Sequence, residues 1–141
     1  MRRLVLLIAS TRRSTLKLIA TLIFVFSPLP ARAESLIFQK AIAGDAFQAS
    51  GRIVALYGIE PPAPSDPNAY AATLYLDTVL AHASLDCRTV PGTPRMACKA
   101  NGADVASELV QMGMGRSAGA AYTAEQADAQ LHRRGMWQVI K

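Results

Sequence analysis

Two carboxylates, Asp45 and Glu60, stand at the ends of a pair of predicted strands that glycines interrupt. Asp45 directly follows Gly44, which is the residue order of a tight turn, and Glu60 precedes Pro61 and Pro62. Carboxylate oxygens are the ligands that a hard cation such as Ca²⁺ prefers, and two that converge can share one ion. The alternative interpretations are that Asp45 only forms the turn and that Glu60 is a solvated loop carboxylate.

The two cysteines lie symmetrically about a turn signal. Cys87 and Cys98 flank the segment Pro91-Gly92-Thr93-Pro94, and a fold at its centre places them directly opposite each other in an antiparallel strand pair. Opposed Cα atoms in such a pair lie about 4.5 to 5.5 Å apart, within the range that a disulfide accepts. We therefore predict a Cys87–Cys98 disulfide. A redox or metal-binding pair is the alternative, and it needs closer spacing or further ligands.

Hydrophobic periodicity places the remaining elements around these motifs. Strands are expected over residues 35–42, 45–50, 51–57, 85–90 and 95–100, and helices from Asn68 onward, from Asp104 to Gly113 and from Thr123 to near Gly135. In the first helix, the apolar face is expected to consist of Ala71, Leu74, Tyr75, Thr78 and Val79. The pattern by itself predicts an α+β fold that is mainly β.

The first 33 residues have the composition of a targeting segment. A basic front precedes the apolar stretch 18–26, and Ala31-Arg32-Ala33 is a cleavage pattern of small residues. The apolar stretch is about half the roughly 20 residues that a bilayer-spanning helix needs, so an uncleaved anchor is the less favoured interpretation. We predict a signal peptide over residues 1–33, cleavage after Ala33, and a periplasmic or secreted domain over residues 34–141.

Removal of this leader changes the charge of the protein. Six of the fifteen basic residues lie in the leader and none of the ten acidic residues do, which leaves nine basic and ten acidic residues in the rest of the chain. Binding to a polyanion needs a surplus of Lys and Arg that neutralises phosphates. The charge balance therefore does not favour nucleic acid as a partner. The remaining 108 residues suffice for one domain with one core.

The order of the motifs resembles that of the thermonuclease (staphylococcal nuclease-like) family. The family pattern is a Gly-Asp turn followed by a strand that reads Ile-Arg-Leu-x-Gly-Ile-Asp-Ala-Pro-Glu. This chain carries its similar pieces, in the family's order, at Gly44-Asp45, at residues 53–62, at Arg95, at Asn101-Gly102, at Glu108, at Tyr122 and at Gly135-Met136-Trp137. The similarity covers nearly all of residues 36–138. It implies a five-stranded barrel of the OB type with about three peripheral helices.

The resemblance also assigns roles to individual positions. Family members hydrolyse DNA and RNA with a Ca²⁺ ion held by two aspartates, a glutamate beside the attacking water and two arginines on the phosphate. By similarity, Asp45 and Glu60 take the metal positions and Arg95 takes one phosphate position, although Arg95 can equally be an exposed cross-strand residue. Ala55 and Ala63 stand where the family has the other arginine and the glutamate.

Loss of these two groups predicts a degenerate active site. We expect a domain that is non-hydrolytic, or very weak as a nuclease, and that acts as a binding or scaffold module with weak Ca²⁺ binding or none. One alternative is an active Ca²⁺-dependent nuclease that recruits Arg88, Arg116 or Arg133. A second is a module that binds a glycan or an envelope protein, because relatives similar to this chain occur among exopolysaccharide-associated proteins.

Overall fold

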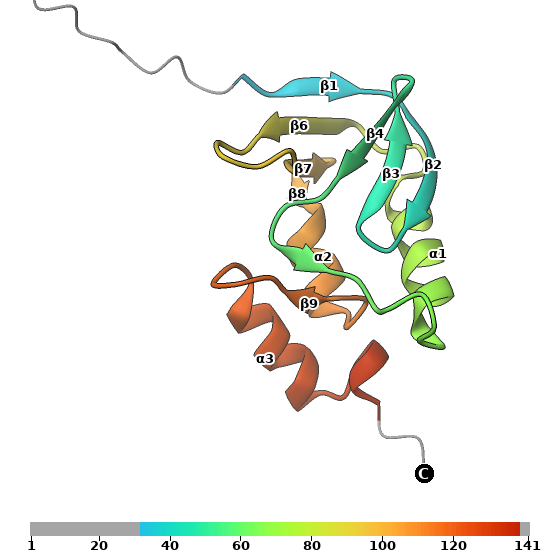
Figure 1. Cartoon of the computed structure of the whole chain (residues 1–141), viewed down its shortest axis with the longest axis vertical. Coiled ribbons are helices and arrows are strands. Elements are labelled where there is room, and N and C mark those ends of the chain that lie inside the picture. The colour runs from blue at the N-terminus through green and yellow to red at the C-terminus, as the bar shows by residue number, and fades with distance from the viewer. Residues whose placement is uncertain (1–31, 139–141) are drawn as a thin grey trace, which may run out of the picture.

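The structure, a computed structural model, describes residues 32–138 and joins nine short strands to three α-helices and one turn of 3₁₀ helix (Figure 1). The elements in chain order are β1 (Glu34–Leu36), β2 (Phe38–Ala43), β3 (Ala46–Ala49), β4 (Arg52–Ala55), β5 (Ile59–Glu60), α1 (Asn68–Leu80), β6 (Leu85–Thr89), β7 (Met96–Ala100), β8 (Ala103–Asp104), α2 (Val105–Gln111), β9 (Arg116–Ser117), α3 (Thr123–Leu131) and η1 (Gly135–Trp137). The α+β prediction is confirmed. The predicted leader lies almost wholly outside the described residues.

The strands form three hydrogen-bonded sheets. One is the antiparallel meander β2-β3-β4, the second has the order β1-β6-β7-β8, and the third is the short pair β5-β9. A parallel bridge between Leu56 and Met96 joins the meander to the second sheet. Within residues 32–138 the three sheets are not closed into one continuous barrel.

The first predicted strand is divided in two at Ile37. The backbone carbonyl of Ile37 accepts a hydrogen bond from the Ser50 amide at 2.8 Å, and its own amide donates to Ser50 Oγ at 2.9 Å. Before this point the chain pairs with β6, and after it the chain pairs with β3. The single predicted strand over residues 35–42 was therefore wrong in its continuity, because a partner from the β3–β4 turn interrupts the ladder.

The cysteine hairpin has the predicted register. Cys87 of β6 lies opposite Cys98 of β7, the two are joined in a disulfide, and both are buried in the core. The amide of Val90 donates to the carbonyl of Arg95, which closes the turn between the strands. The symmetry of the sequence about the turn predicted this register, and the predicted disulfide is confirmed.

Helix α1 covers the meander with a face that is shifted from the predicted one, although Tyr75 and Val79 of the predicted face are partly buried against the core. Its buried residues are Ala72, Leu76 and Leu80, while Leu74 is 52% exposed. The amide of Ala41 in β2 donates to Asp77 Oδ1 at 2.9 Å and holds the helix against the sheet. Because apolar residues surround most of this helix, periodicity alone did not distinguish the buried stripe from its neighbour.

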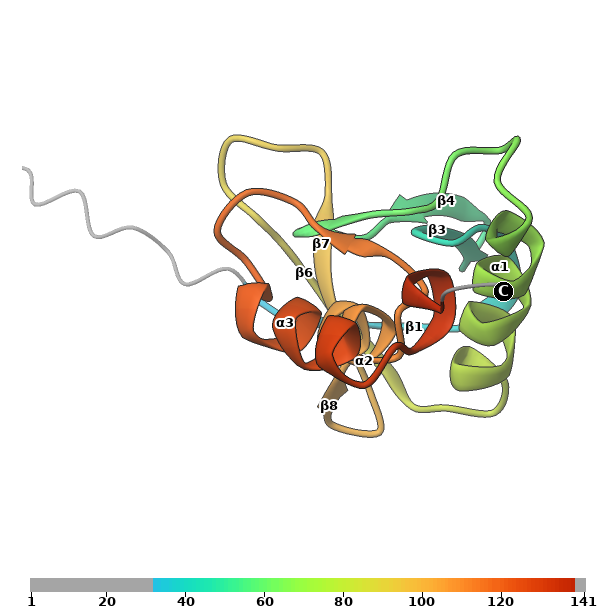
Figure 2. The same cartoon turned by 90° about the horizontal axis from the view of Figure 1, so that it is seen from below.

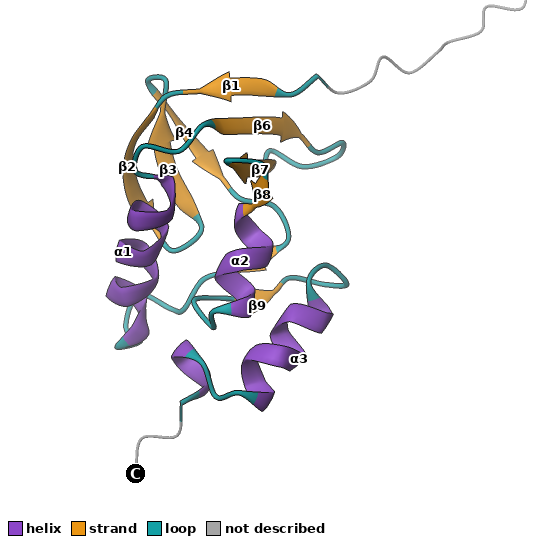
Figure 3. Cartoon of the chain, turned by 180° about the vertical axis from the view of Figure 1, so that it is seen from behind, coloured by secondary structure: helices purple, strands orange, loops and turns teal. Residues whose placement is uncertain are grey.

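The other two helices lie beyond the second sheet. Asp104 accepts a hydrogen bond from the Ser107 amide and caps α2, which starts where it was predicted and ends at Gln111, two residues before the predicted Gly113. Helix α3 begins at Thr123, but Tyr122 precedes it in a left-handed conformation and no side chain caps it; the helix ends at Leu131, short of the predicted Gly135. From below, α1 and α3 lie on opposite sides of α2 (Figure 2), and from behind α1 and α2 run side by side (Figure 3). None of the described helices has the length and apolar character to cross a membrane.

Loss of the disulfide is expected to destabilise the domain. Its chain-entropy contribution for so short a loop is about 3 kcal/mol. The variant Cys87→Ala/Cys98→Ala should therefore lose about 3 kcal/mol of unfolding free energy in chemical denaturation. The matched control Arg88→Ala/Lys99→Ala replaces exposed neighbours of each cysteine and should change stability by less than about 0.5 kcal/mol. Equal stability of the cysteine variant and the native protein would contradict the prediction.

Candidate functional site

Asp45 is held at the turn between β2 and β3. Its backbone carbonyl accepts a hydrogen bond from the Leu56 amide at 2.8 Å, so the turn is attached to the end of β4. A Cβ on the preceding Gly44 would stand 2.9 Å from Ala72 Cβ, and only glycine lets α1 approach this closely. The Asp45 side chain is 10% exposed. A carboxylate so placed needs a fixed positive partner, because burial of a lone charge is costly.

Arg95, which directly precedes β7, supplies that partner. Its Nη1 donates to Asp45 Oδ2 at 2.8 Å and to the Leu56 backbone carbonyl at 2.7 Å. The Arg95 side chain is 40% exposed, so the ion pair lies at the edge of the solvent. The two sequence-predicted residues are thus bonded to each other, across fifty residues of chain.

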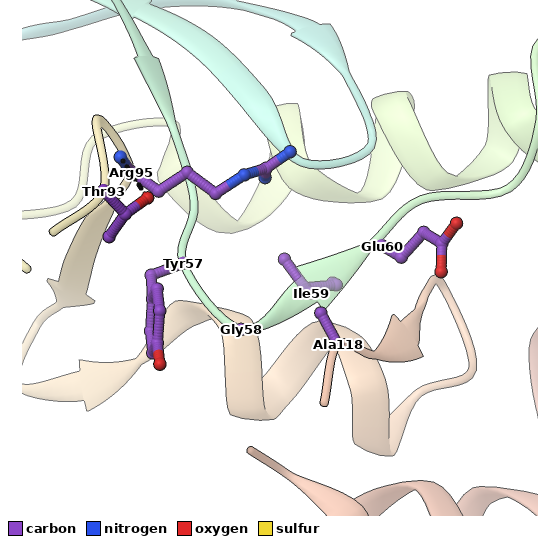
Figure 4. Close-up of a pocket in the computed structure, with 7 residues that line it drawn as sticks. All are labelled: Tyr57, Gly58, Ile59, Glu60, Thr93, Arg95 and Ala118. Atoms are coloured by element: carbon purple, nitrogen blue, oxygen red, sulfur yellow. Dashed lines mark hydrogen bonds between the residues drawn. The ribbon is translucent and has the colours of Figure 1, made fainter. Parts of the chain in front are cut away.

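An open pocket of about 340 Å³ lies beside this ion pair. Figure 4 shows Tyr57 and Thr93 on one side of it and Glu60 on the other, with the chain from Gly58 to Ile59 between them; the residues that line the pocket are Tyr57, Gly58, Ile59, Glu60, Thr93, Arg95 and Ala118. The carboxylate of Glu60 points away from the Arg95 guanidinium in this view. The pocket therefore holds one predicted metal residue and the predicted phosphate residue, but not bonded to each other.

Glu60 and Ala63 face a second, smaller pocket of about 170 Å³, which Arg116 also lines. Glu60 pairs with Arg116 across the β5-β9 ladder, and the Arg116 guanidinium lies 5.7 Å from the centre of the Trp137 ring. Within this pocket, the pKa of Asp66 is lowered first by the backbone amide of Asn68, then by the Asn68 side chain, and also by the charge of Arg116. The sequence analysis named Arg116 only as one of three arginines that a rearranged nuclease site could recruit.

Ala55 lies in a row of methyl groups. It is opposite Ala46 on β3, and Ala46 is opposite Ala43 on β2. All three are half-buried. These three positions therefore supply no positive side chain that could stabilise an anion.

Tyr122 forms the floor below Gly58. A Cβ on Gly58 would stand 2.6 Å from Tyr122 Cε2, so the tyrosine ring is in direct contact with the pocket wall. Its hydroxyl donates to the Asp104 carboxylate, with Oδ2 at 3.1 Å. Burial first, and then the negative charge of Asp104, raise the pKa of Tyr122 to about 12. Its position in the motif order gave no sign of this contact.

The structure brings together Asp45 and Arg95, and it places Glu60 in the same pocket as Arg95. Ala55 and Ala63 do not line that pocket. Among residues 32–138, no group of three or more His, Cys, Asp or Glu side chains is arranged to hold a metal ion. Sequence reasoning missed the pocket residues Thr93 and Tyr57, and the place of Thr93 in the cysteine turn was the only signal for it.

No protein-family model matches this chain, and a comparison with curated proteins finds no match. The resemblance drawn from the motif order therefore stays a prediction.

The close contact of Gly58 with Tyr122 can be tested with a matched pair of variants. Gly58 and Gly92 have nearly the same left-handed φ, +80° and +78°, but a Cβ on Gly92 would meet no atom within 4 Å. Both Gly→Ala changes carry the same backbone cost, about 1 kcal/mol. Only Gly58→Ala adds overpacking, about 1 to 3 kcal/mol more. Chemical denaturation should rank Gly58→Ala as the less stable variant, and equal losses would refute the contact.

Proposed function

We propose that this chain is an exported, thermonuclease-like domain with a degenerate active site, which acts as a binding module and not as an efficient nuclease. The observation that supports this most is the ion pair between Arg95 and Asp45. One residue of the proposed metal site and one of the proposed phosphate site are engaged with each other. Both charges are therefore already satisfied within the protein.

The ion pair is a poor starting point for calcium binding. Ca²⁺ takes six to eight oxygen ligands, with carboxylates prominent among them. At Asp45, one carboxylate oxygen accepts a guanidinium hydrogen bond, and a cation placed there would meet the fixed positive charge of Arg95. The Arg95 guanidinium serves as the counter-ion of the Asp45 carboxylate, and it cannot diffuse away because it is covalently part of the chain. We expect no functional Ca²⁺ site.

The two substituted positions point in the same direction. A transition-state donor of the oxyanion type contributes roughly 10² to 10³ in rate, and general-base assistance contributes roughly 10² to 10⁴. Alanine at positions 55 and 63 supplies neither. The combined deficit is at least about 10⁴ relative to an intact family enzyme.

The contacts between strands support an OB-type barrel as part of the proposal. The first strand segment contributes β1 to one sheet and β2 to another, with a break only at Ile37. From β2 the neighbours run through β3 and β4, across the parallel bridge of Leu56 with Met96, to β7 and β6, and back to β1. Five strand segments in this cyclic order, with a helix after the third, are consistent with an OB-type topology.

The disulfide supports export to the periplasm or beyond. Disulfides persist in oxidising compartments and are rare in a reducing cytosol. The bridge between Cys87 and Cys98 is consistent with the signal peptide predicted over residues 1–33.

An active nuclease with a rearranged site is the second candidate, and one observation favours it. Glu60 lines both the pocket that contains Arg95 and the neighbouring pocket that contains Arg116. A carboxylate that borders two arginine-lined pockets could serve a rearranged phosphodiesterase site, with Arg116 beside Ala63.

A nuclease assay separates the two candidates. The purified protein, incubated with single-stranded DNA and Ca²⁺, should show turnover at least about 10⁴ lower than an intact thermonuclease. Chelation of Ca²⁺ and the variant Asp45→Asn serve as controls for a contaminating enzyme. Turnover close to that of an intact enzyme, lost in Asp45→Asn, would establish the rearranged nuclease and end the proposal of a degenerate site.

A further inference from the structure

The pocket beside the ion pair lies between two turns of the molecule. The β2–β3 turn contributes Asp45 behind the pocket, and the β6–β7 turn contributes Thr93 and Arg95 to its wall. In OB-type barrels, these two turns flank the groove that takes oligonucleotides or oligosaccharides. This step rests on the proposed function, which includes the OB-type barrel.

The lining offers a flat apolar surface and several hydrogen-bonding groups. Tyr57 exposes 40% of its surface. The hydroxyl oxygen of Thr93 accepts from the Arg95 amide, which leaves its own proton free to donate. Arg95 uses only Nη1 in its bonds to the described residues, so Nε and Nη2 remain as donors, and Glu60 is an acceptor. Such a combination suits a ligand with one apolar face and a rim of hydroxyl groups.

The charge around the pocket does not favour an anion. The positive charge of Arg95 is matched by Asp45 at 2.8 Å, and the negative charge of Glu60 lies opposite Arg116 in the β5-β9 ladder. These four groups therefore carry no net positive charge to attract a phosphate. A neutral polyhydroxylated ring needs no such charge. The volume of about 340 Å³ is at the small end of ligand pockets, which suits one ring of a longer chain.

We infer that this pocket binds one neutral sugar unit of an oligosaccharide. The ring packs one face against Tyr57, and its hydroxyl groups donate to Glu60 and accept from Arg95 and Thr93. The proposed loss of hydrolysis and this recognition of sugar depend on the same ion pair, because pairing with Asp45 removes the charge that would attract a phosphate.

The test is a titration of the ¹⁵N-labelled protein followed by NMR. The probes are maltopentaose, cellopentaose and laminaripentaose, each to about 10 mM, since contacts with a single ring give millimolar affinities. Pentathymidylate is titrated in parallel as a polyanion of the same length. We expect at least one of the three sugars to shift the amide signals of Tyr57, Thr93 and Glu60, and pentathymidylate to leave them unchanged.

Variants locate the site. Tyr57→Ala should weaken sugar binding about tenfold through loss of the stacking surface. Tyr70→Ala is the matched control, because Tyr70 is a 77% exposed tyrosine on α1 outside this pocket, and binding should be unchanged. If Tyr57→Ala does not give a native-like spectrum, Glu60→Ala, at an exposed position, takes its place with the same expected direction.

Absence of shifts with all three sugars would overturn the inference. Shifts at these residues caused by pentathymidylate alone would also overturn it. A third contrary result is sugar binding that Tyr70→Ala weakens as much as Tyr57→Ala does. The same protein samples, assayed for cleavage of single-stranded DNA, report on the proposed function separately. Cleavage refutes the degenerate site, whereas no cleavage together with no sugar binding refutes only the sugar inference.

Discussion

The bond between the Arg95 guanidinium and the Asp45 carboxylate connects three parts of the chain that are far apart in sequence. Asp45 belongs to the β2–β3 turn, Leu56 directly follows β4, and Arg95 directly precedes β7. A single nitrogen of the Arg95 guanidinium donates both to the Asp45 carboxylate and to the Leu56 carbonyl. A carboxylate with a side chain only 10% exposed is unfavourable without such a partner. The pair acts together with the backbone hydrogen bonds from Leu56 to Asp45 and from Tyr57 to Met96, and these contacts jointly set the relative position of the three segments and the shape of the pocket beside them.

The pocket wall is set by close packing as much as by charge. The chain can pass from β4 to β5 at Gly58 only because no side chain there meets the ring of Tyr122. Tyr122 in turn is fixed by its hydroxyl at Asp104, the residue that caps α2. Helix α2 thus supports the pocket through a single tyrosine. The candidate site is a surface pocket whose wall is closely packed against Tyr122. Such a wall suits recognition of a ligand better than a large conformational change of the pocket.

Much of the fold followed from local signals in the sequence. The register of the cysteine hairpin came from the symmetry of its turn, and the start of α2 came from the capping residue Asp104. Features set by distant contacts did not follow. The break at Ile37 depends on Ser50, and the buried face of α1 depends on the sheet that it covers. Periodicity carries no information about such partners.

In the candidate site, too, local signals were predictive and contacts between distant residues were not. The residue types of Asp45, Glu60 and Arg95 indicated chemistry, and their motif order indicated a shared location. No local signal predicted that Arg95 would bond to Asp45 and that Glu60 would lie on the opposite side of the pocket (Figure 4). A hydrogen bond across fifty residues depends on the assembled fold. Whether two charged groups share a ligand or neutralise each other is decided at that level.

Calorimetric titration of the purified protein with Ca²⁺ tests most directly whether the guanidinium has replaced a metal ion. We predict no saturable binding up to about 1 mM Ca²⁺, a range that includes the weaker calcium sites of extracellular proteins. Saturable binding in this range that disappears in the variant Asp45→Asn would show that the carboxylate exchanges Arg95 for a cation, and it would contradict the central claim.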